Sequence, residues 1–331
     1  MDHYPNYTQN TSVFPHLIFK KRHFLYFFLR LLNFVNYDEK NENLTGNPLA
    51  FCAIFLYNGF ILGWCGEKSS PPSESFLRNA VKGGSSVGEL IAVLSGKGGT
   101  GKTSMCAAIA SALAQSGERV LCIDCDVGLR NLDIALGMSD MAALSFVDVY
   151  SGAYDLLQAA KHPVFAPLQF LTAPMNCPAE KVDVDAFGAM LENARRHFNY
   201  VFLDAPAGIE AGFQLAARFA DRVILVTGAD PAAVRDASRA AEVLELMGKT
   251  NVRLVVNRIN EKMFSMMKLT VDDIMDEAGV PLLGLVPEDA NVVLAAAFKQ
   301  PLLCYTKKGA AAACRRIAKR LQGLRQRITI K

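Results

Sequence analysis

The chain has 331 residues, 51% of them hydrophobic, and a formal net charge of +3. This length and apolar content allow one large α/β domain or two small ones, and they exclude a chain that is disordered throughout. The net charge conceals an uneven distribution: residues 307–331 contain nine Lys or Arg and no Asp or Glu, whereas residues 87–306 contain 26 acidic and 18 basic side chains. A basic end of this kind predicts contact with anionic lipid or nucleic acid, unless it is only the solvated face of a last helix.

The eight cysteines show no spacing typical of a disulfide framework. Cys122 and Cys125 form a C-x-x-C pair, but the segment Arg119–Asp124 has the composition of a buried strand. Side chains three residues apart on a strand point to opposite faces, so we do not expect a redox or metal-binding pair. The cysteine usage favours a reducing, cytosolic compartment.

Residues 1–86 differ in composition from the rest of the chain, being rich in Phe, Tyr and Asn. Their apolar runs, 24–35 and 49–64, are shorter than the roughly 20 residues that a membrane-spanning helix needs. Three interpretations remain: a membrane anchor, a poorly ordered extension, or upstream sequence translated ahead of the true start. The abrupt beginning of a domain-like pattern at Val87 favours the third, because an internal GTG start codon would be read as valine. We therefore predict a spurious or poorly ordered segment 1–86, a compact domain 87–323 and a basic tail 324–331.

From residue 89 onward, strand-like and helix-like segments alternate. Apolar, β-rich runs lie at Leu90–Leu94, Arg119–Ile123, Leu168–Leu171, Tyr200–Leu203, Arg222–Val226, Arg253–Val256 and Leu282–Val286. Helical patterns lie at Thr103–Gln115, Val184–His197, Ala211–Phe219, Pro231–Met247, Val271–Ala278, Ala290–Phe298 and Gly309–Gln322. Apolar strands that alternate with helices predict an α/β fold: a doubly wound, mostly parallel sheet of seven to eight strands with helices on both faces.

A glycine-rich loop, G-K-G-G-T-G-K-T, joins the first of these strands to the first helix. This spacing in a strand–loop–helix context is typical of the P-loop of nucleotide-binding proteins, whose backbone amides surround phosphate groups. We predict phosphate contacts from the whole loop, that is Gly96, Lys97, Gly98, Gly99, Thr100, Gly101, Lys102 and Thr103. Lys102 is expected to reach the β- and γ-phosphates of ATP, and the Thr103 hydroxyl to bind Mg²⁺. A chance glycine-rich turn is the competing interpretation.

Lys97 is a second lysine inside the loop, and K-G-G-T-G-K-T resembles the deviant Walker A loop of the MinD/ParA family of ATPases. The resemblance implies that Lys97 reaches across an ATP-dependent homodimer to the phosphates of the partner subunit. The competing interpretation is a lysine that faces solvent.

Two carboxylates, Asp124 and Asp126, end the second apolar strand, at the edge of the sheet where α/β proteins bind ligands. The run D-x-D-x-G-L-R-N-L-D resembles the switch I segment of the MinD branch of the family. That resemblance implies that Asp126 positions the hydrolytic water, that Asp124 supports Mg²⁺ and that Asn131 assists at the γ-phosphate. For Asp133 we expect a helix N-cap instead.

The strand Asn199–Asp204 also ends in a carboxylate and resembles a Walker B element, which would hold Mg²⁺ through Asp204. The following P-A-G-I-E resembles switch II of the same branch, with the Gly208 amide placed to sense the γ-phosphate. At the ends of two later strands, Asn257 and Pro287 match the adenine-side segments of the family. Asp230 is predicted to cap a helix that begins with Pro231, at a place where the family contacts partners.

The resemblance covers about 88–322 and implies the function of the chain. It implies binding of ATP with Mg²⁺, hydrolysis to ADP and phosphate, and an ATP-dependent homodimer that regulates placement of the bacterial division site. The implied partners are a MinC-like division inhibitor and a MinE-like or other topological factor, on the cytoplasmic face of the cell membrane and without nucleic acid. A ParA-type partitioning ATPase or a flagellar-number regulator remains the alternative.

The resemblance is weakest in the basic tail, where a membrane-binding helix would be expected. Ile317, Leu321, Leu324 and Ile328 form an apolar stripe with basic neighbours, as in helices that lie on an anionic membrane surface. Gly323 interrupts the stripe, and we expect Ile317 and Leu321 to pack on the domain. Membrane binding by this tail therefore stays open.

Overall fold

The computed structural model describes residues 35–38, 43–46, 87–175, 177, 179–268 and 270–329. By its contacts the chain divides into two units, Met1–Gly83 and Gly84–Lys331. The described part of the first unit is an antiparallel pair of strands, β1 (Val35–Asp38) and β2 (Asn43–Gly46). Our interpretation of residues 1–86 otherwise falls outside the described residues and stays a prediction. Among the described residues, no helix is long and apolar enough to cross a membrane.

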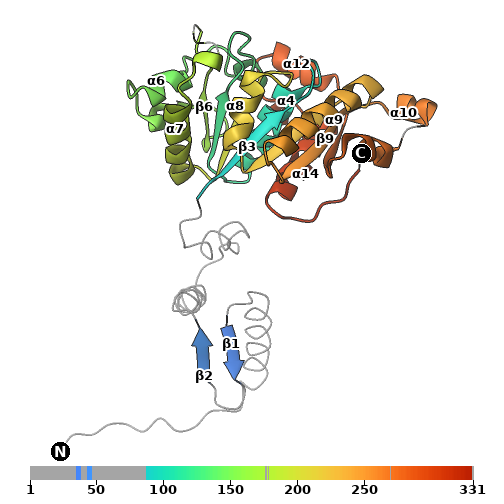
Figure 1. Cartoon of the computed structure of the whole chain (residues 1–331), viewed down its shortest axis with the longest axis horizontal. Helices are drawn as coiled ribbons and strands as arrows, with labels where there is room; N and C mark the ends of the chain where they lie inside the picture. Colours follow the sequence, from blue (N-terminus) through green and yellow to red (C-terminus); the bar gives the residue numbers. More distant parts are fainter. Residues whose placement is uncertain are drawn as a thin grey trace, which may run out of the picture. The chain divides into compact units, whose positions relative to one another are not determined.

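The second unit is built around one eight-stranded sheet (Figure 1). In spatial order its strands are β10 (Leu282–Pro287), β9 (Val252–Ile259), β8 (Arg222–Thr227), β3 (Glu89–Leu94), β7 (Tyr200–Asp204), β4 (Val120–Asp124), β6 (Leu168–Leu171) and β5 (Ala160–Lys161). Neighbouring strands are parallel except β5, which runs antiparallel to β6 at one edge. The predicted, mostly parallel sheet of seven to eight strands is confirmed.

Helices pack on both faces of the sheet, which confirms the doubly wound α/β prediction (Figure 1). One face carries α6 (Phe146–Tyr150), α7 (Val184–His197), α8 (Ala211–Phe219), α9 (Pro231–Leu246) and α11 (Val271–Ala278). The other carries α4 (Lys102–Gln115), α5 (Leu132–Leu136), α12 (Asn291–Ala297), α13 (Leu302–Tyr305) and α14 (Gly309–Leu321). The short helix α10 (Glu261–Met267) buries none of its residues.

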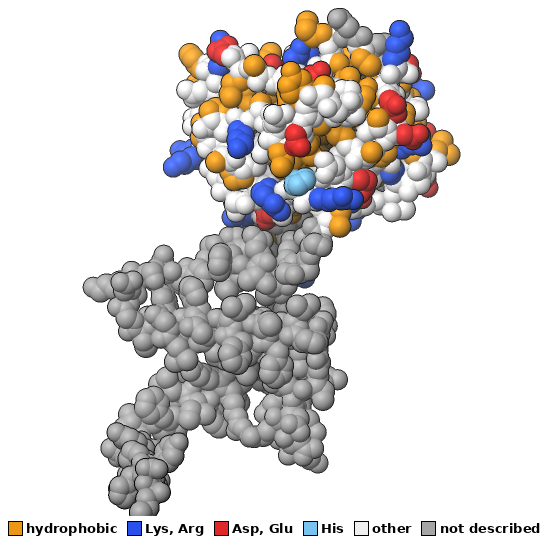
Figure 2. Space-filling model, turned by 90° about the vertical axis from the view of Figure 1, so that its left-hand side faces the viewer, with side chains coloured by type: hydrophobic (Ala, Val, Ile, Leu, Met, Phe, Trp, Pro, Cys, Tyr) orange, Lys and Arg blue, Asp and Glu red, His pale blue; other side chains and the backbone are white. Residues whose placement is uncertain are grey.

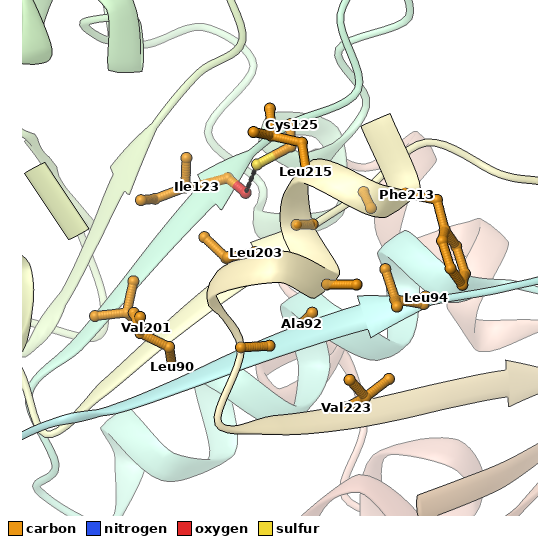
Figure 3. Close-up of a cluster of buried hydrophobic side chains, with 14 of the residues drawn as sticks. Leu90, Ala92, Leu94, Ile123, Cys125, Val201, Leu203, Phe213, Leu215 and Val223 are labelled. Atoms are coloured by element: carbon orange, nitrogen blue, oxygen red, sulfur yellow. Dashed lines mark hydrogen bonds between the residues drawn. The ribbon is translucent and has the colours of Figure 1, made fainter. Parts of the chain in front are cut away.

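The central strand β3 shows how the sequence divides the core into two layers. Leu90, Ala92 and Leu94 belong to one buried cluster, whereas Ile91 and Val93 belong to the other. Figure 3 shows the first cluster, in which side chains of β3, β4 and β7 lie beneath α8. Because a strand alternates its side chains, a continuously apolar strand is one that is covered on both faces.

The same alternation separates the two cysteines of the C-x-x-C sequence. Cys122 is buried in the cluster beneath α4, and Cys125 is buried in the opposite cluster, where its thiol lies 3.8 Å from the carbonyl of Ile123 (Figure 3). Burial raises the pKa of both thiols. The prediction that they form no pair is confirmed.

The chain beyond α14 folds back on that helix. Residues 324–329 contain no helix; the Arg316 guanidinium donates to the carbonyl of Thr329 at 3.1 Å, and that of Arg320 to the carbonyl of Gln326 at 2.8 Å. Ile317 and Leu321 are buried, as predicted. The apolar stripe seen in the sequence is therefore divided between the core and an extended segment.

Candidate functional site

The predicted phosphate loop lies at the carboxyl ends of the central strands, between β3 and α4. Gly101 stands directly before α4 in the left-handed region (φ +85°), where L side chains are strained. At Gly96 the constraint is steric: a Cβ there would lie 2.1 Å from the carbonyl oxygen of Asp236 on α9. The glycines thus allow the loop both its turn and its close packing against a helix.

Lys102, Thr103 and Asp204 meet inside this site, although 100 residues separate the last two in the chain. The Lys102 ammonium lies 2.6 Å from Asp204 Oδ1 and 3.3 Å from Thr103 Oγ1. The Lys102 and Asp204 side chains are only 6% and 1% exposed, so the ion pair is shielded from water. The residues predicted to hold phosphate and Mg²⁺ are therefore in contact with each other.

A second carboxylate adjoins this pair, because strand register places Asp124 opposite Asp204 on the neighbouring strand. Burial, and next the charge of Asp204, raise the pKa of Asp124 to about 7. Burial also raises the pKa of Asp204, although Lys102 opposes this shift, and burial raises that of Asp126. Asp124 and Asp126 thus lie close to the buried Lys102–Asp204 pair, and a divalent cation would offset the repulsion among these carboxylates.

The chemistry of this cluster fits Mg²⁺. Asp204 Oδ2 is buried and has no hydrogen-bond partner, which leaves a carboxylate oxygen ready to accept from a metal-bound water. Among the described residues, no group of three His, Cys, Asp or Glu side chains is arranged to hold a metal ion alone. Mg²⁺ suits such a site, because it keeps several waters and takes further oxygens from the phosphates of its nucleotide.

The switch I segment is held by Asp124. Its Oδ1 accepts from the backbone N–H of Asp126 at 2.9 Å, and its Oδ2 accepts from that of Leu132 at 3.2 Å. Since this carboxylate satisfies the first free N–H of α5, the helix starts earlier than we predicted. Its N-cap is Asn131, and the prediction for Asp133 is wrong: that residue lies in the first turn and accepts from Ile134 N–H.

Switch II contacts the entrance of the phosphate loop. Gly208, in the left-handed region at φ +98°, donates its N–H to the carbonyl of Ser95 at 3.0 Å. A Cβ at Gly208 would meet nothing within 4 Å, so open space adjoins this backbone. The predicted γ-phosphate sensor is thus next to the loop, and its role stays a prediction.

Lys97 lies apart from the buried ion pair. Its ammonium is 3.2 Å from Asp230 Oδ1, and the two side chains are 36% and 56% exposed. Asp230 also caps α9 by accepting from Ala233 N–H at 2.9 Å, with Pro231 in the first turn, as predicted. Although partial burial opposes it, hydrogen bonds from Ala233 N–H and the Lys97 ammonium hold the pKa of Asp230 below its usual value. The two lysines of the loop therefore have separate carboxylate partners.

On the side where we predicted adenine contacts, the end of β9 contacts the phosphate loop directly. Asn257, 4% exposed, donates from Nδ2 to the carbonyl of Thr100 at 2.8 Å. Arg258 donates from Nη1 to the carbonyl of Gly99 at 2.9 Å. Pro287, at the end of neighbouring β10, pairs with Ile259. The contact of Arg258 was not predicted, because an arginine beside an asparagine matches no motif in the sequence.

A pocket of about 460 Å³ opens beside the loop. Its lining includes Lys97, Gly99, Asp230, Arg258, Met263 and Glu288. A second pocket, of about 500 Å³, lies between the starts of α7 and α8 and the end of α9, and it contains none of the predicted site residues. Only the first pocket is continuous with the phosphate site.

Comparison with known proteins agrees with this geometry. Residues 91–302 match the model of the CobQ/CobB/MinD/ParA nucleotide binding domain. The septum site-determining protein MinD of Bacillus subtilis strain 168 is 38% identical over 243 residues, which cover 72% of this chain and 90% of that protein. That of Synechocystis is 35% identical over 237 residues, or 71% and 89%.

Solved structures show the same similarity. The MinC:MinD cell division protein complex of Aquifex aeolicus aligns with a TM-score of 0.68 at 33% identity, covering 73% of this chain and 98% of that one. The Mg-ADP complex of septum site-determining protein MinD from Pyrococcus horikoshii OT3 aligns with a TM-score of 0.62 at 25% identity, covering 70% and 95%. A ParA family ATPase from Chlorobium tepidum, at 18% identity, a TM-score of 0.62 and coverage of 71% and 99%, shows a shared fold alone.

Proposed function

Because the chain belongs to the CobQ/CobB/MinD/ParA family of nucleotide-binding proteins, we propose that it hydrolyses ATP to ADP and phosphate as a dimerising switch in placement of the bacterial division site. The observation that carries the proposal is the buried contact of Lys102 with Asp204 beside Asp124, where three strands end. Septum site-determining relatives at 35–38% identity supply the biological context.

Different residues of this site would bind the phosphates, hold Mg²⁺ and orient the attacking water. Lys102 would exchange Asp204 for the phosphates of the nucleotide, to which its ammonium would donate charge-assisted hydrogen bonds. Thr103 would hold Mg²⁺, with Asp204 acting through water and Asp124 in support; when bound, the ion supplies charge neutralisation at the phosphates. Asp126 would orient the attacking water, with Asn131 beside the γ-phosphate. Catalysis would rest on positioning, so hydrolysis without a partner should be slow.

The dimer part of the proposal rests on Lys97. Its ammonium is paired with Asp230 at the mouth of the pocket, while Lys102 alone occupies the interior of the loop. An exposed lysine–aspartate pair is worth little in water, so a partner's phosphates could draw Lys97 away from Asp230 at small cost. ATP binding would thereby favour two subunits placed loop to loop.

Lys97→Ala tests this proposal, with ATP hydrolysis measured by phosphate release and dimerisation by size-exclusion chromatography with light scattering. The variant should keep nucleotide binding and lose both ATP-dependent dimerisation and most hydrolysis. Lys299→Ala is the matched control, because Lys299 forms a similarly exposed pair with Asp140. A Lys97→Ala protein that dimerises and hydrolyses like the wild type would refute the cross-subunit lysine.

We propose that the partners are a MinC-like division inhibitor and a MinE-like or other topological factor, at the cytoplasmic face of the membrane. The Aquifex aeolicus complex supports the first of these. Peripheral membrane binding is supported by the basic end of the chain, with Ile328 53% exposed on the tail.

Among the described residues, the side of the molecule that carries α6 and α7 shows no such concentration of one charge: basic and acidic side chains are mixed there among hydrophobic ones (Figure 2).

Sedimentation with phospholipid vesicles distinguishes the proposed membrane function from DNA partitioning. Vesicles that contain anionic lipid should retain the protein with ATP and release it with ADP. Salt-dependent binding to duplex DNA, without binding to vesicles, would instead favour the partitioning alternative.

A further inference from the structure

The end of β9 is irregular at the point where it meets the phosphate loop. Between Val256 and Ile259 this strand has two residues, Asn257 and Arg258, where its neighbour β10 has one. Arg258 is in the left-handed region at φ +58°, which is unusual for a residue with a long side chain. The extra residue is a β-bulge, a feature that redirects side chains within a strand.

The bulge turns two consecutive side chains toward the same loop. In a regular strand these neighbours would point to opposite faces. Here Asn257 donates to the carbonyl of Thr100 at 2.8 Å, and Arg258 donates to the carbonyl of Gly99 at 2.9 Å. A Cβ at Gly101 would lie 2.4 Å from Asn257 Nδ2, so this approach also depends on the glycine.

These two hydrogen bonds have a consequence for the amides of the loop. A peptide unit is planar and trans, so its N–H points away from its C=O. Holding the carbonyls of Gly99 and Thr100 therefore orients the N–H groups of Thr100 and Gly101 in the opposite direction, away from β9. In a phosphate loop, those N–H groups are what the anion binds.

We propose that Asn257 and Arg258 are positioning residues of the phosphate site: they hold the loop by its outward carbonyls and thereby aim its amides at the nucleotide phosphates. The proposal deepens the nucleotide-binding function and rests on it. It makes the β9 bulge a determinant of affinity for any triphosphate, whatever its base.

The test compares ATP, GTP and inorganic tripolyphosphate as competitors of a ribose-labelled fluorescent ATP analogue, with Mg²⁺ present. Asn257→Ala should weaken all three by the same factor, about tenfold, which corresponds to the loss of one buried hydrogen bond. Arg258→Ala should act in the same way, and Arg258→Lys, which keeps a donor and the charge, should recover part of the loss. Arg253→Ala is the matched control on the same strand, since Arg253 donates to the carbonyl of its neighbour Val252.

The pattern across the three competitors decides the outcome. Weaker ATP binding with unchanged tripolyphosphate binding would show that Asn257 reads adenine, as the family resemblance suggests, and would overturn the proposal. Unchanged binding of all three would also overturn it. Should Asn257→Ala fail to fold, Arg258→Ala, which removes an exposed hydrogen bond, decides alone. A wild type that binds neither ATP nor tripolyphosphate would instead refute the proposed function.

Discussion

Charged side chains gather at both ends of the central strands, but they are arranged differently. At the amino edge, Asp221 lies against the Arg195 guanidinium and accepts from Leu90 N–H at 2.8 Å, and Glu89 lies 2.9 Å from Arg222. These side chains are 15–40% exposed. Each carboxylate at this edge has its own arginine and partial access to water.

At the carboxyl edge, by contrast, the buried pair of Lys102 and Asp204 lies beside a second buried carboxylate, Asp124. Burial and mutual repulsion raise the pKa of Asp124 to about 7, and Asp204 Oδ2 has no partner. Unpaired buried charge costs stability unless something else compensates it. The charged groups of the amino edge are therefore compensated within the chain, whereas those of the carboxyl edge are suited to a cation and phosphates that come from outside.

Removing the buried lysine should give the largest effect. Lys102→Ala is expected to lower ATP hydrolysis by a factor of about 100 or more, since it removes the buried ammonium that each subunit would place on its own phosphates. Steady-state phosphate release measures this, with Lys299→Ala as the control that should hydrolyse ATP normally. Normal hydrolysis by Lys102→Ala would mean that the carboxyl edge, like the amino edge, is only structural.

The carboxyl edge should also make stability depend on pH. The folded protein keeps a proton on Asp124 up to about pH 7, whereas the unfolded chain loses it near pH 4. The folded state therefore binds more protons in this interval, so the free energy of unfolding should fall as pH rises, by up to about 1.4 kcal/mol per pH unit from this group.

Urea unfolding of the nucleotide-free protein between pH 4 and 8 measures this dependence. Asp124→Asn should flatten the profile, and Asp221→Asn at the amino edge should leave its slope between pH 5 and 7 unchanged. If the unfolding free energy of Asp124→Asn fell equally steeply with pH, another group would be responsible for the pH dependence.

At the amino edge, the expected effect is on stability alone. Asp221→Ala removes the acceptor of Leu90 N–H and the partner of Arg195, and should cost about 1–2 kcal/mol of unfolding free energy. Calorimetric titration with ADP should show unchanged affinity. Glu192→Ala, which removes the more exposed partner of Arg195, is the control and should cost less. Weaker ADP binding by Asp221→Ala would erase the distinction between the edges.

The smallest effect is expected at Glu89. Burial raises its pKa, although Arg222 opposes this shift, so the charge of Glu89 is only partly compensated. Glu89→Gln keeps the shape and an acceptor for Arg222, and should change the unfolding free energy by about 0.5 kcal/mol or less. A loss comparable to that of Asp221→Ala, measured in the same urea titration, would contradict this estimate.

The elements that could be predicted from the sequence are those with long apolar patterns. Helices α7 and α8 were predicted to the residue, because their apolar spacing and flanking residues agree. Strand β5 was missed, since two residues carry no alternation, and α10 was missed because it buries none of its residues. Helix α5 has five residues, and its start is decided by the carboxylate of Asp124, which lies eight residues before Leu132.

For the site, the sequence predicted which segments come together at the carboxyl edge of the sheet. The loop 96–103, Asp124 and Asp204 follow apolar strands, and parallel strands end at the same edge of a sheet, so their convergence could be predicted. The contacts that these residues make could be seen only in the folded chain. They are the ion pair of Lys97 with Asp230, the hydrogen bond of Gly208 to Ser95, and those of the β9 bulge to the loop carbonyls. Motif residues are close in the chain and follow a pattern, whereas these contacts join segments up to 159 residues apart through register and bulge geometry that no local pattern encodes.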